Sequence, residues 1–431
     1  MLIERLIEIE PERKTERAVL VGVCLPGTDR RETEETMEEL ALLADTAGVE
    51  VVGRIVQERA ALDPATFIGK GKVLELRQMV EETGADAVIF DDDLSPAQDR
   101  NVERVTQVKV LDRSILILDI FASHARSREA RTQVELAQLE YLLPRLTRQW
   151  THLSRQVSSA GGISGGIGTR GPGETQLEVD RRAIRKRIRD LTRALERIEK
   201  HRETERKGRA GLFKAALVGY TNAGKSTLMR ALSGADVLVE NQLFSTLDST
   251  TRAVPLGYNR QVLMTDTVGF IRKLPTHLVA SFRSTLEEAV RADLLLHIVD
   301  VSHPACEEQI AAVLETLEGL QIAEHPTLMV FNKIDRLDDP ARLSALMHAH
   351  DEAVAVSGLT GEGMEDLKRK LYEKLEQGRV VLDVRVSQTE GRFLSELYEV
   401  GEILERSYEG NDVLLKVKLP GEDARRLQLV G

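Results

Sequence analysis

A glycine-rich segment at 219–226 has the residue types and spacing that bind phosphate. It reads Gly-Tyr-Thr-Asn-Ala-Gly-Lys-Ser, follows an apolar run at 215–218 and precedes a helix-like segment, which is the sequence context of a phosphate loop. The glycines allow backbone N–H groups to point at phosphate oxygens. We expect Lys225 to reach the β- and γ-phosphates and the Ser226 hydroxyl to bind Mg²⁺. Taken alone, this segment indicates a nucleoside triphosphate of unspecified base.

The base is predicted by a second motif, Asn-Lys-Ile-Asp at 332–335, which directly follows a strand-like run at 327–331. The carboxylate of Asp335 can accept hydrogen bonds from guanine N1–H and from the 2-amino group, and adenine offers neither donor there. A site built for those donors therefore rejects adenine. The Ser-Gly-Leu segment at 357–359 follows another strand-like run, 353–356, and can support guanine O6 from its backbone.

Between these two motifs lies the sequence Asp-Thr-Val-Gly at 266–269, after a strand-like run at 261–264. Asp266 is placed to hold Mg²⁺ through water. The N–H of Gly269 is placed to touch the γ-phosphate, a contact that hydrolysis would remove. This is how switch segments of nucleotide-hydrolysing proteins are released.

The segment 244–251, Phe-Ser-Thr-Leu-Asp-Ser-Thr-Thr, is expected to be the other switch. One threonine must bind Mg²⁺ and sense the γ-phosphate, and we choose Thr246, with Thr250 and Thr251 as alternatives. A solvated loop rich in Ser and Thr is the competing interpretation.

The predicted site combines these segments. The predicted catalytic residues are Lys225, Thr246 and Gly269, and the predicted metal ligands are Ser226 and Thr246. The residues predicted to bind the nucleotide are Gly219, Tyr220, Thr221, Asn222, Ala223, Gly224, Lys225, Ser226, Thr227, Phe244, Ser245, Thr246, Leu247, Asp248, Asp266, Thr267, Val268, Gly269, Asn332, Lys333, Ile334, Asp335, Ser357, Gly358 and Leu359.

Phe270 follows Gly269 at the position where many GTPases carry a glutamine that orients the attacking water. A phenyl ring cannot hydrogen-bond to water, so slow intrinsic hydrolysis that depends on a partner is one expectation. The alternative is that Phe270 only packs in the domain and another polar group orients the water.

Other candidate groups are less specific. The run Asp91, Asp92 and Asp93 follows a strand-like segment, and we favour a solvated loop or helix cap over a cation site. The chain has only two cysteines, Cys24 and Cys306, so no disulfide framework is predicted and both are expected to be buried and reduced. The nine histidines are scattered and form no zinc-type cluster.

Composition and charge exclude several classes of protein. Hydrophobic residues make up 42% and charged residues 30% of the chain, as in an ordinary globular protein, and the N-terminal segment lacks the apolar core of a signal peptide. No apolar run is long enough to span a membrane, so we expect a cytoplasmic protein. The net charge of −11 argues against uniform wrapping by nucleic acid but allows a local basic patch.

The order of apolar and charged segments predicts an α/β protein with four parts. They are an N-terminal α/β domain (1–125), a helical hairpin (126–210), a P-loop domain with a mostly parallel sheet and helices on both faces (211–378), and a small α+β domain (379–431). Predicted strands in the first part are 18–23, 51–55, 87–90, 108–111 and 115–120, and predicted helices are 31–47 and 72–83. In the last part, strands at 380–386 and 413–419 enclose a helix at 391–405.

The hairpin is predicted from two leucine-rich stripes with spacings of three and four residues, separated by a loop at 161–173 with seven glycines. The first stripe contains Pro144, where we expect a kink or break. The second stripe lies on a basic segment, 181–210, that carries thirteen Lys or Arg against five Asp or Glu. We interpret the loop as the hairpin tip that contacts RNA, although a flexible linker is the alternative.

Taken together, these features resemble the HflX family of ribosome-associated GTPases over most of the chain. The resemblance rests on Phe-Ile-Gly-Lys-Gly-Lys at 67–72, on Gly-Gly-Ile-Gly-Thr-Arg-Gly-Pro-Gly-Glu at 165–174, and on the order of the four nucleotide motifs. The middle motif is the most specific of these. Gly358, where guanine-binding loops often have alanine, is a small departure.

The resemblance implies a GTPase that uses GTP with Mg²⁺, binds the large ribosomal subunit and its RNA, and splits or rescues stalled ribosomes. It also implies that the hairpin tip reaches ribosomal RNA. We expect a monomer. Two other functions remain open from the residues alone. One is a nucleotide-driven protein that remodels RNA by itself, and the other is a metabolic P-loop phosphotransferase, which the 332–335 motif argues against.

Overall fold

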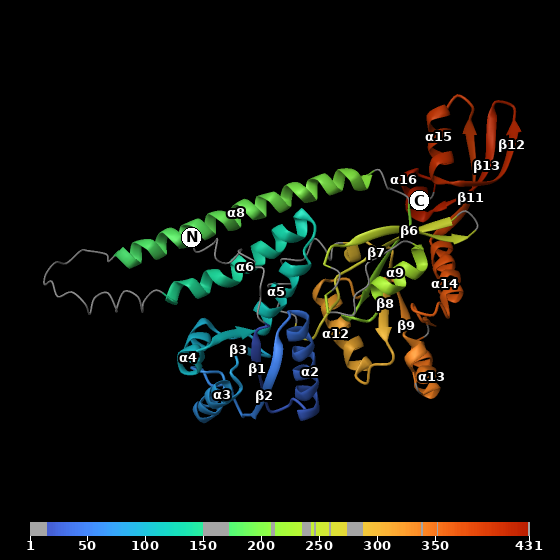
Figure 1. The fold of residues 1–431 in the computed structure, drawn as a ribbon. Coiled ribbons are helices and arrows are strands. Elements are labelled where there is room, and N and C mark those ends of the chain that lie inside the picture. Colours follow the sequence, from blue (N-terminus) through green and yellow to red (C-terminus); the bar gives the residue numbers. More distant parts are fainter. Residues whose placement is uncertain are drawn as a thin grey trace. The chain divides into compact units, whose positions relative to one another are not determined.

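The structure is a computed structural model. It describes residues 15–149, 172–207, 212–234, 243–244, 247–257, 260–273, 288–337, 339–350 and 352–429 (Figure 1). The chain forms two compact units. The described parts of 1–199, 240–248 and 271–284 belong to the first unit, and the described parts of 200–239, 249–270 and 285–431 belong to the second. Two short segments of the predicted P-loop domain are therefore part of the N-terminal unit.

The N-terminal unit contains a four-stranded parallel sheet with the strand order β2-β1-β3-β4. Its strands are β1 (Arg17–Cys24), β2 (Glu50–Glu58), β3 (Ala87–Phe90) and β4 (Lys109–Asp112), and its helices are α2 (Arg30–Thr46), α3 (Lys70–Thr83), α4 (Pro96–Thr106) and α5 (Arg113–His124). Apolar side chains of α3 and α4 pack with Val19 and Val88 on one face. On β1, Gly22 leaves room for the side chain of Met37 from α2.

The predicted strand at 115–120 is wrong, because this segment lies within helix α5. Asp112 caps the helix by accepting a hydrogen bond from the N–H of Ile115 at 3.0 Å. Most of the helix is buried, including Leu116, Ile117, Leu118, Ile120 and Phe121, so its sequence is largely apolar, with Asp119 exposed. A short apolar run of this kind does not distinguish a buried strand from a buried helix.

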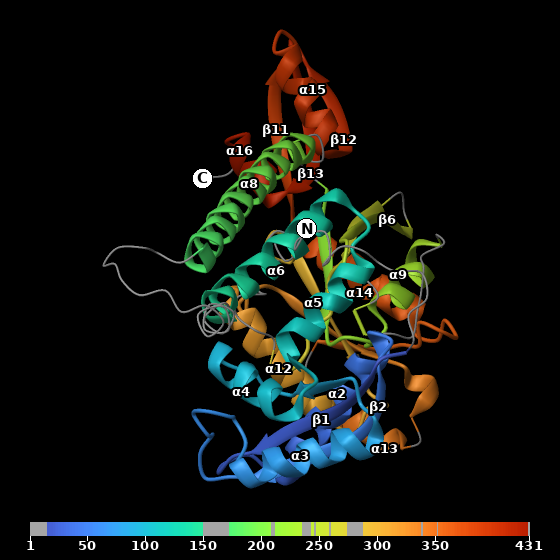
Figure 2. The same ribbon diagram turned by 60° about the vertical axis from the view of Figure 1, so that its left-hand side comes forward.

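The hairpin helices are α6 (Arg128–Gln149) and α8 (Pro172–Lys207), which lie side by side in Figures 1 and 2. Arg187 donates two hydrogen bonds to Glu135, at 2.7 and 2.8 Å, which joins the middle of α8 to the first half of α6. Ile184 and Leu191 of the predicted stripe are buried. The two helices run in opposite directions in Figure 1, as predicted for a helical hairpin. The predicted α/β fold class is confirmed as well.

Pro144 does not break α6, which continues to Gln149. Of the predicted kink or break at Pro144, the break is therefore excluded. The residues on either side of Pro144 are held to one carboxylate, because Tyr141 Oη and Arg145 Nη2 both donate to Asp112 Oδ2, at 2.8 and 2.9 Å. These contacts from β4 stabilise the helix where proline removes a backbone hydrogen bond.

The second unit contains a six-stranded sheet with the order β10-β9-β8-β5-β7-β6, in which only β6 is antiparallel to its neighbour. The strands are β5 (Lys214–Gly219), β6 (Thr250–Gly257), β7 (Arg260–Asp266), β8 (Leu294–Asp300), β9 (Thr327–Asn332) and β10 (Ala353–Ala355). The helices are α9 (Lys225–Ser233), α12 (Cys306–Gly319), α13 (Pro340–Ala349) and α14 (Met364–Gln377), with a short 3-10 turn, η1, at Ile334–Arg336.

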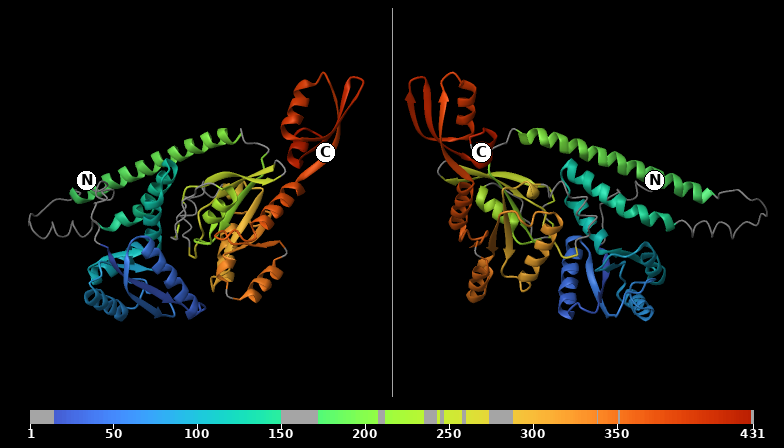
Figure 3. Two further views of the ribbon diagram at one scale, coloured as in Figure 1. Left: turned by 45° about the vertical axis from the view of Figure 1, so that its right-hand side comes forward. Right: turned by 180° about the vertical axis from the view of Figure 1, so that it is seen from behind.

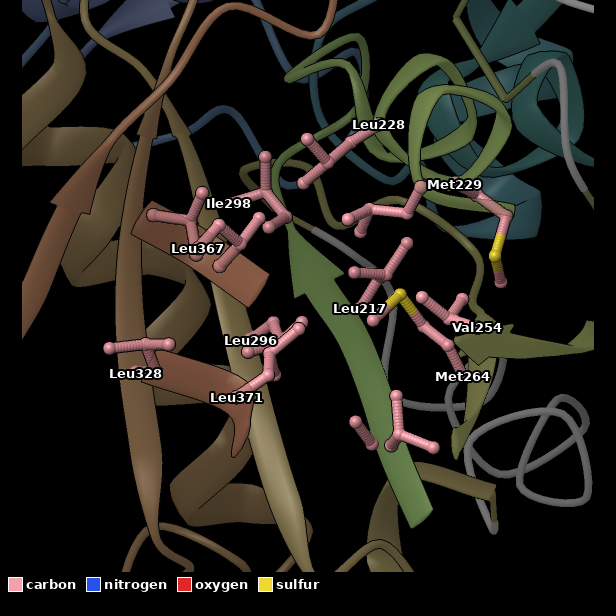
Figure 4. Close-up of a cluster of buried hydrophobic side chains, with 14 of the residues drawn as sticks. Leu217, Leu228, Met229, Val254, Met264, Leu296, Ile298, Leu328, Leu367 and Leu371 are labelled. Atoms are coloured by element: carbon pink, nitrogen blue, oxygen red, sulfur yellow. The ribbon is translucent and has the colours of Figure 1, made fainter. Parts of the chain in front are cut away.

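Alternating residues of the central strands fill two cores. Leu328 and Val330 of β9 face one core with α9 and α14, where Leu228 and Leu367 pack beside Leu296 (Figure 4). The residues between them on β9 face the other core with α12 and α13. The helices therefore cover both faces of a mostly parallel sheet, as predicted.

The last part of the chain forms a three-stranded antiparallel sheet, β11-β13-β12, with α15 on one face (Figure 3). Its elements are β11 (Arg379–Ser387), α15 (Gly391–Val400), β12 (Glu402–Glu409), β13 (Asp412–Pro420) and α16 (Gly421–Arg426). The helix predicted at 391–405 is too long, because it ends at Gly401, whose extended backbone leads into β12. Both cysteines are buried and free, as predicted.

Candidate functional site

The phosphate loop joins the end of β5 to the start of α9, at the carboxyl edge of the six-stranded sheet. A Cβ on Gly219 would lie 2.3 Å from the carbonyl oxygen of Ile298, and a Cβ on Gly224 would lie 2.3 Å from Asn332 Nδ2. Both glycines also have positive φ, +151° and +94°. The loop thus requires glycine at both ends for space as well as for backbone conformation.

Lys225, the first residue of α9, is buried and points back into the loop. Its ammonium donates hydrogen bonds to the carbonyl oxygens of Gly219, at 3.1 Å, and Tyr220, at 2.9 Å. Burial lowers the pKa of Lys225 to about 8; the negative charge of Asp266 opposes this shift and the positive charge of Lys333 adds to it. The loop therefore holds a weakly solvated cation next to the N-terminus of a helix, an arrangement that attracts anions.

The end of β7 lies against this loop. Asp266 is buried and its Oδ2 accepts a hydrogen bond from Ser226 Oγ at 2.6 Å. Thr267 Oγ1 donates to the carbonyl of Leu217 at 2.6 Å. A hydroxyl and a carboxylate are thus brought together beside the phosphate loop.

Gly269 and Phe270 continue this contact with the phosphate loop. A Cβ on Gly269 would lie 2.7 Å from Thr221 Cα and 3.0 Å from Lys225 Nζ. The N–H of Phe270 donates to the carbonyl of Gly219 at 3.1 Å, and the carbonyl of Phe270 accepts from Thr221 N–H at 2.7 Å. The Phe270 side chain is 1% exposed, so its ring packs in the interior.

The base motif is tied to both neighbouring loops by Asn332. Its Nδ2 donates to the carbonyl of Ala223 at 2.8 Å, and its Oδ1 accepts from the N–H of Gly358 at 3.0 Å. Lys333 has a positive φ of +63° and forms an ion pair with Asp300 at 2.7 Å. The sequence 332–335 therefore aligns the phosphate loop with the 357–359 loop.

Asp335 lies in η1, where its Oδ1 accepts a hydrogen bond from Ser357 Oγ at 2.6 Å. The carboxylate belongs to an exposed residue, whereas Ser357 is fully buried. Leu359 is 68% exposed beside it. An accessible carboxylate held by a buried hydroxyl can accept donors from a ligand.

Comparison with known proteins identifies this combination of parts. Residues 34–122 match the family described as GTP-binding GTPase N-terminal, 124–209 match GTP-binding GTPase Middle Region, and 214–333 match 50S ribosome-binding GTPase. The GTPase HflX of Caldanaerobacter subterraneus subsp. tengcongensis is 44% identical over 421 residues, which cover 97% of this chain and 94% of that protein. The chain belongs to the HflX GTPase family.

A second HflX GTPase, from Escherichia coli strain K12, is 44% identical over 417 residues, which cover 96% of this chain and 95% of that protein. The crystal structure of the complex of SsGBP with GDP is similar to this chain with a TM-score of 0.47 and 25% identity, and covers 83% of this chain and 98% of that one. As an HflX GTPase, this protein binds and hydrolyses GTP. The GTPase predicted from the sequence motifs is confirmed.

Not all predicted residues of the HflX nucleotide site lie in one unit. The phosphate loop, 266–269, 332–335 and 357–359 all belong to the second unit. Phe244, Leu247 and Asp248 belong to the first unit, and Ser245 and Thr246 lie outside the described residues.

The alternatives to Thr246 lie in strand β6. Thr250 pairs in register with Asp266, and Thr251 with Thr265. The hydroxyls of Thr251 and Thr265 are 2.9 Å apart and share a hydrogen bond.

Sequence analysis did not find the role of Asp300, which ends β8 and holds Lys333. The available signal was an acidic residue at the end of a mostly apolar strand, because such residues gather at the carboxyl edge of a parallel sheet.

The residues 91–93 form a loop, as favoured, in which Asp92 is half-buried and Asp93 is exposed, but the prediction that the loop is solvated is wrong for Asp91. Asp91 is 1% exposed and pairs with Arg113 Nη1 at 2.7 Å, while Asp93 accepts a hydrogen bond from Ser114 Oγ. Within the described ranges, no cluster of His, Cys, Asp or Glu is arranged to hold a metal ion, and no helix is long and apolar enough to cross a membrane.

Proposed function

We propose that this HflX GTPase binds the large ribosomal subunit and its RNA in the GTP-bound state, and that hydrolysis releases it. Its proposed role is to split or rescue stalled ribosomes, acting as a monomer in the cytoplasm. The observation that supports this most directly is the exposed basic face of α8. Arg185, Lys186 and Arg189 are exposed, whereas Ile184 and Leu191 on the same helix are buried.

A helix with one buried stripe and one exposed basic face is suited to phosphate backbones, since Lys and Arg contacts to phosphate dominate affinity for nucleic acid. The matching of 214–333 to the family described as 50S ribosome-binding GTPase supports the same partner. The glycine-rich tip at 161–173, of which 161–171 lie outside the described residues, is proposed to contact the RNA.

For the nucleotide, we propose that Lys225 pairs with the β- and γ-phosphates, that Gly269 N–H contacts the γ-phosphate, and that Asp335 reads guanine. The remaining predicted residues of the phosphate loop, 266–269, 332–335 and 357–359 would line the same ligand.

Mg²⁺ would be held by Ser226 and Thr246, with Asp266 acting through water. The hydroxyl and carboxylate at 2.6 Å fit this ion, which prefers oxygen ligands. When bound, Mg²⁺ neutralises negative charge on the phosphates.

Hydrolysis by the isolated protein is expected to be slow, roughly 10⁻⁴ to 10⁻² per second, as in unassisted switch GTPases. The buried ring of Phe270 cannot orient water. Isolated large subunits should accelerate turnover, whereas naked RNA should not. The measurement is GTP turnover with large subunits, small subunits, naked ribosomal RNA, or no addition. Fast turnover that ribosomes leave unchanged would contradict the proposal, and stimulation by naked RNA alone would indicate an RNA-remodelling protein.

Variants of the hairpin extend this test. Arg185→Glu with Lys186→Glu should weaken ribosome binding and flatten its salt dependence, because phosphate contacts are lost. A matched reversal on α14, Arg369→Glu with Lys370→Glu, should leave ribosome binding and its salt dependence unchanged.

Replacing 161–173 by a short neutral turn should leave GTP binding intact and reduce ribosome stimulation and subunit splitting. If the loop variant shows wild-type ribosome stimulation and subunit splitting, the loop is only a linker.

The affinity for GTP should depend on pH through Lys225. Its pKa is lowered to about 8 by burial, and phosphate oxygens would raise it by favouring the ammonium form. Below about pH 8 the lysine is already charged. Above it, binding must take up a proton, so Kd should rise by about tenfold per pH unit. Titration with a non-hydrolysable GTP analogue measures this slope, and Lys225→Met should remove it. The same slope in Lys225→Met would assign the titration to another group.

A further inference from the structure

Strand β12 forms one edge of the C-terminal sheet, whose strand order is β11-β13-β12 (Figure 1). Among the described residues β12 pairs with β13 alone, so no strand lies along its other side. A register shift interrupts the pairing between Ile403 and Glu405, and from Glu405 to Glu409 the pairing is regular. We call the unpaired side of 405–409 the free edge. Such an edge presents backbone groups to which another strand can bind.

The register of β12 shows which backbone groups lie on the free edge. Glu409 pairs with Asp412 across a two-residue turn, and residues that close such a turn form a hydrogen-bonded pair. Because hydrogen-bonded and non-hydrogen-bonded pairs alternate, Ser407 also bonds to β13, whereas Arg406 and Tyr408 direct their N–H and C=O groups away from it. An added strand can therefore exchange hydrogen bonds with both of these residues.

The side chains of Arg406 and Tyr408 lie on the sheet face that α15 covers, since their partners Leu415 and Val413 belong to the core on that face. Tyr398 of α15 lies beside them. The Arg406 guanidinium carbon is 5.8 Å from the ring centroid of Tyr398 and 4.7 Å from that of Tyr408. The two tyrosines are 43% and 56% exposed, so an accessible cation–aromatic cluster adjoins the free edge.

Arg406 differs from other cations of this sheet in having no acidic partner. Arg385 pairs with Asp412, and Lys416 pairs with Glu405. Arg406 is exposed, and among the side chains that the structure describes it contacts the two tyrosine rings and no carboxylate. Because the rings already restrict the guanidinium, a carboxylate that binds it costs less side-chain entropy than at a mobile arginine.

We propose that β12 is the docking strand for an extended peptide segment of a partner protein, which adds to the free edge and places an Asp or Glu opposite Arg406. In this mode of recognition the main-chain hydrogen bonds supply affinity and alternate side chains supply specificity. The residue opposite Arg406 projects on the same face of the sheet, so its carboxylate reaches the guanidinium. A β-branched or aromatic side chain opposite Tyr408 packs against its ring in the same way.

The composition of this part of the chain favours a polypeptide over RNA. Residues 379–431 carry eight Lys or Arg against ten Asp or Glu. Affinity for RNA comes largely from Lys and Arg contacts to phosphate, which an acidic domain does not favour. Tyrosine and arginine are also the residues that dominate binding energy in protein–protein interfaces. The inference goes beyond the proposed ribosome binding through α8 and does not depend on it.

The test uses the full-length protein and a fluorescent peptide, Thr-Val-Thr-Glu-Lys-Val, blocked at both ends. Aligned antiparallel to β12, its first valine lies opposite Tyr408, its glutamate opposite Arg406 and its lysine opposite Glu405. Fluorescence anisotropy measures the Kd. Replacing the peptide's glutamate by lysine should weaken binding by about tenfold, the usual effect of losing a hydrogen bond between charged groups.

Methylation of single peptide nitrogens tests the backbone pairing. The glutamate would exchange hydrogen bonds with Arg406, so methylation of its nitrogen should abolish binding. The nitrogen of the preceding threonine would point away from β12. Its methylation is the matched control and should change the Kd by less than about twofold, because no hydrogen bond to the protein is lost.

Charge reversal on the protein completes the test. Arg406→Glu should bind the lysine peptide about tenfold more tightly than the glutamate peptide, which inverts the wild-type preference. Arg392→Glu changes another exposed arginine of α15 and should keep the wild-type preference.

Four results would overturn the inference. They are no binding at millimolar peptide, an unchanged preference in Arg406→Glu, equal binding of the two methylated peptides, and a uridine octamer that binds more tightly than the peptide and is lost in Arg406→Glu. The last result would assign the cluster to single-stranded RNA, whose bases stack on tyrosine and arginine.

Discussion

Replacing Lys225 by alanine is expected to lower the rate constant for GTP hydrolysis by about 10²–10³-fold, the usual loss when one donor to developing negative charge is removed. The ammonium is buried at the start of α9 and donates to two carbonyl oxygens of its own loop. Phosphate oxygens would take the place of these acceptors. No other Lys or Arg of the phosphate loop is available to substitute, because Lys225 is the only basic residue in 219–226.

Single-turnover hydrolysis and GTP affinity measure this effect. Lys214→Ala is a suitable control, since Lys214 begins the same strand β5 at the end opposite to the phosphate loop. The thermal midpoint of Lys225→Ala should not fall, because the substitution removes a buried charge whose desolvation is unfavourable. Wild-type turnover in Lys225→Ala would show that Lys225 does not stabilise the phosphates during GTP hydrolysis.

The parts of the site that sequence analysis found are those whose chemistry is local. The phosphate loop needs glycine at 219 and 224 because of positive φ and close backbone approach, and lysine directly after them. These requirements all act within the eight residues 219–226, so the phosphate loop can be recognised from its amino-acid sequence. The same holds for 332–335, where Asn332 must bridge two loops and leaves little freedom in residue type.

The features that sequence analysis missed depend on partners distant in the chain. The burial of Asp91 was missed because its partner Lys273 lies 182 positions away. The hydrogen bonds that Asp248 accepts from Arg126 and Ser127 were missed as well, because more than 120 positions separate these residues. No periodicity or spacing predicts such pairs. The helix α5 was missed because a short, mostly buried apolar run has no periodicity that distinguishes a helix from a strand.

The division into units also differs from the order of the sequence motifs. Two G-domain segments, which include Phe244 and Lys273, fold with the N-terminal unit. Both adjoin residues proposed to sense the γ-phosphate. The chain thus leaves and re-enters the second unit where nucleotide state would be read.

The second large expected effect is a change in the base that the protein prefers. Asp335→Asn is expected to change the ratio of affinities for GTP and xanthosine triphosphate by about 10⁴-fold, in favour of the latter, as for other sites that read a substrate by hydrogen bonds. Guanine presents an amino donor at C2 where xanthine presents a carbonyl. An aspartate accepts from the amino group. The amide of asparagine donates to the carbonyl instead, and its oxygen still accepts from N1–H.

Asp335→Asn tests base recognition alone, because the structure of the surrounding loop should not change. The bond that holds this side chain runs from Ser357 Oγ to Asp335 Oδ1 at 2.6 Å, and an amide oxygen can accept it equally. Asp335 is exposed, so the neutral side chain creates no buried cavity. The matched control is Asp339→Asn, which changes an exposed aspartate four residues later that caps α13. The measurement is competition between the two triphosphates, followed by single-turnover hydrolysis of each. If Asp335→Asn still prefers GTP while Asp339→Asn behaves as wild type, then Asp335 does not read the base, and the guanine preference must come from the backbone at 357–359.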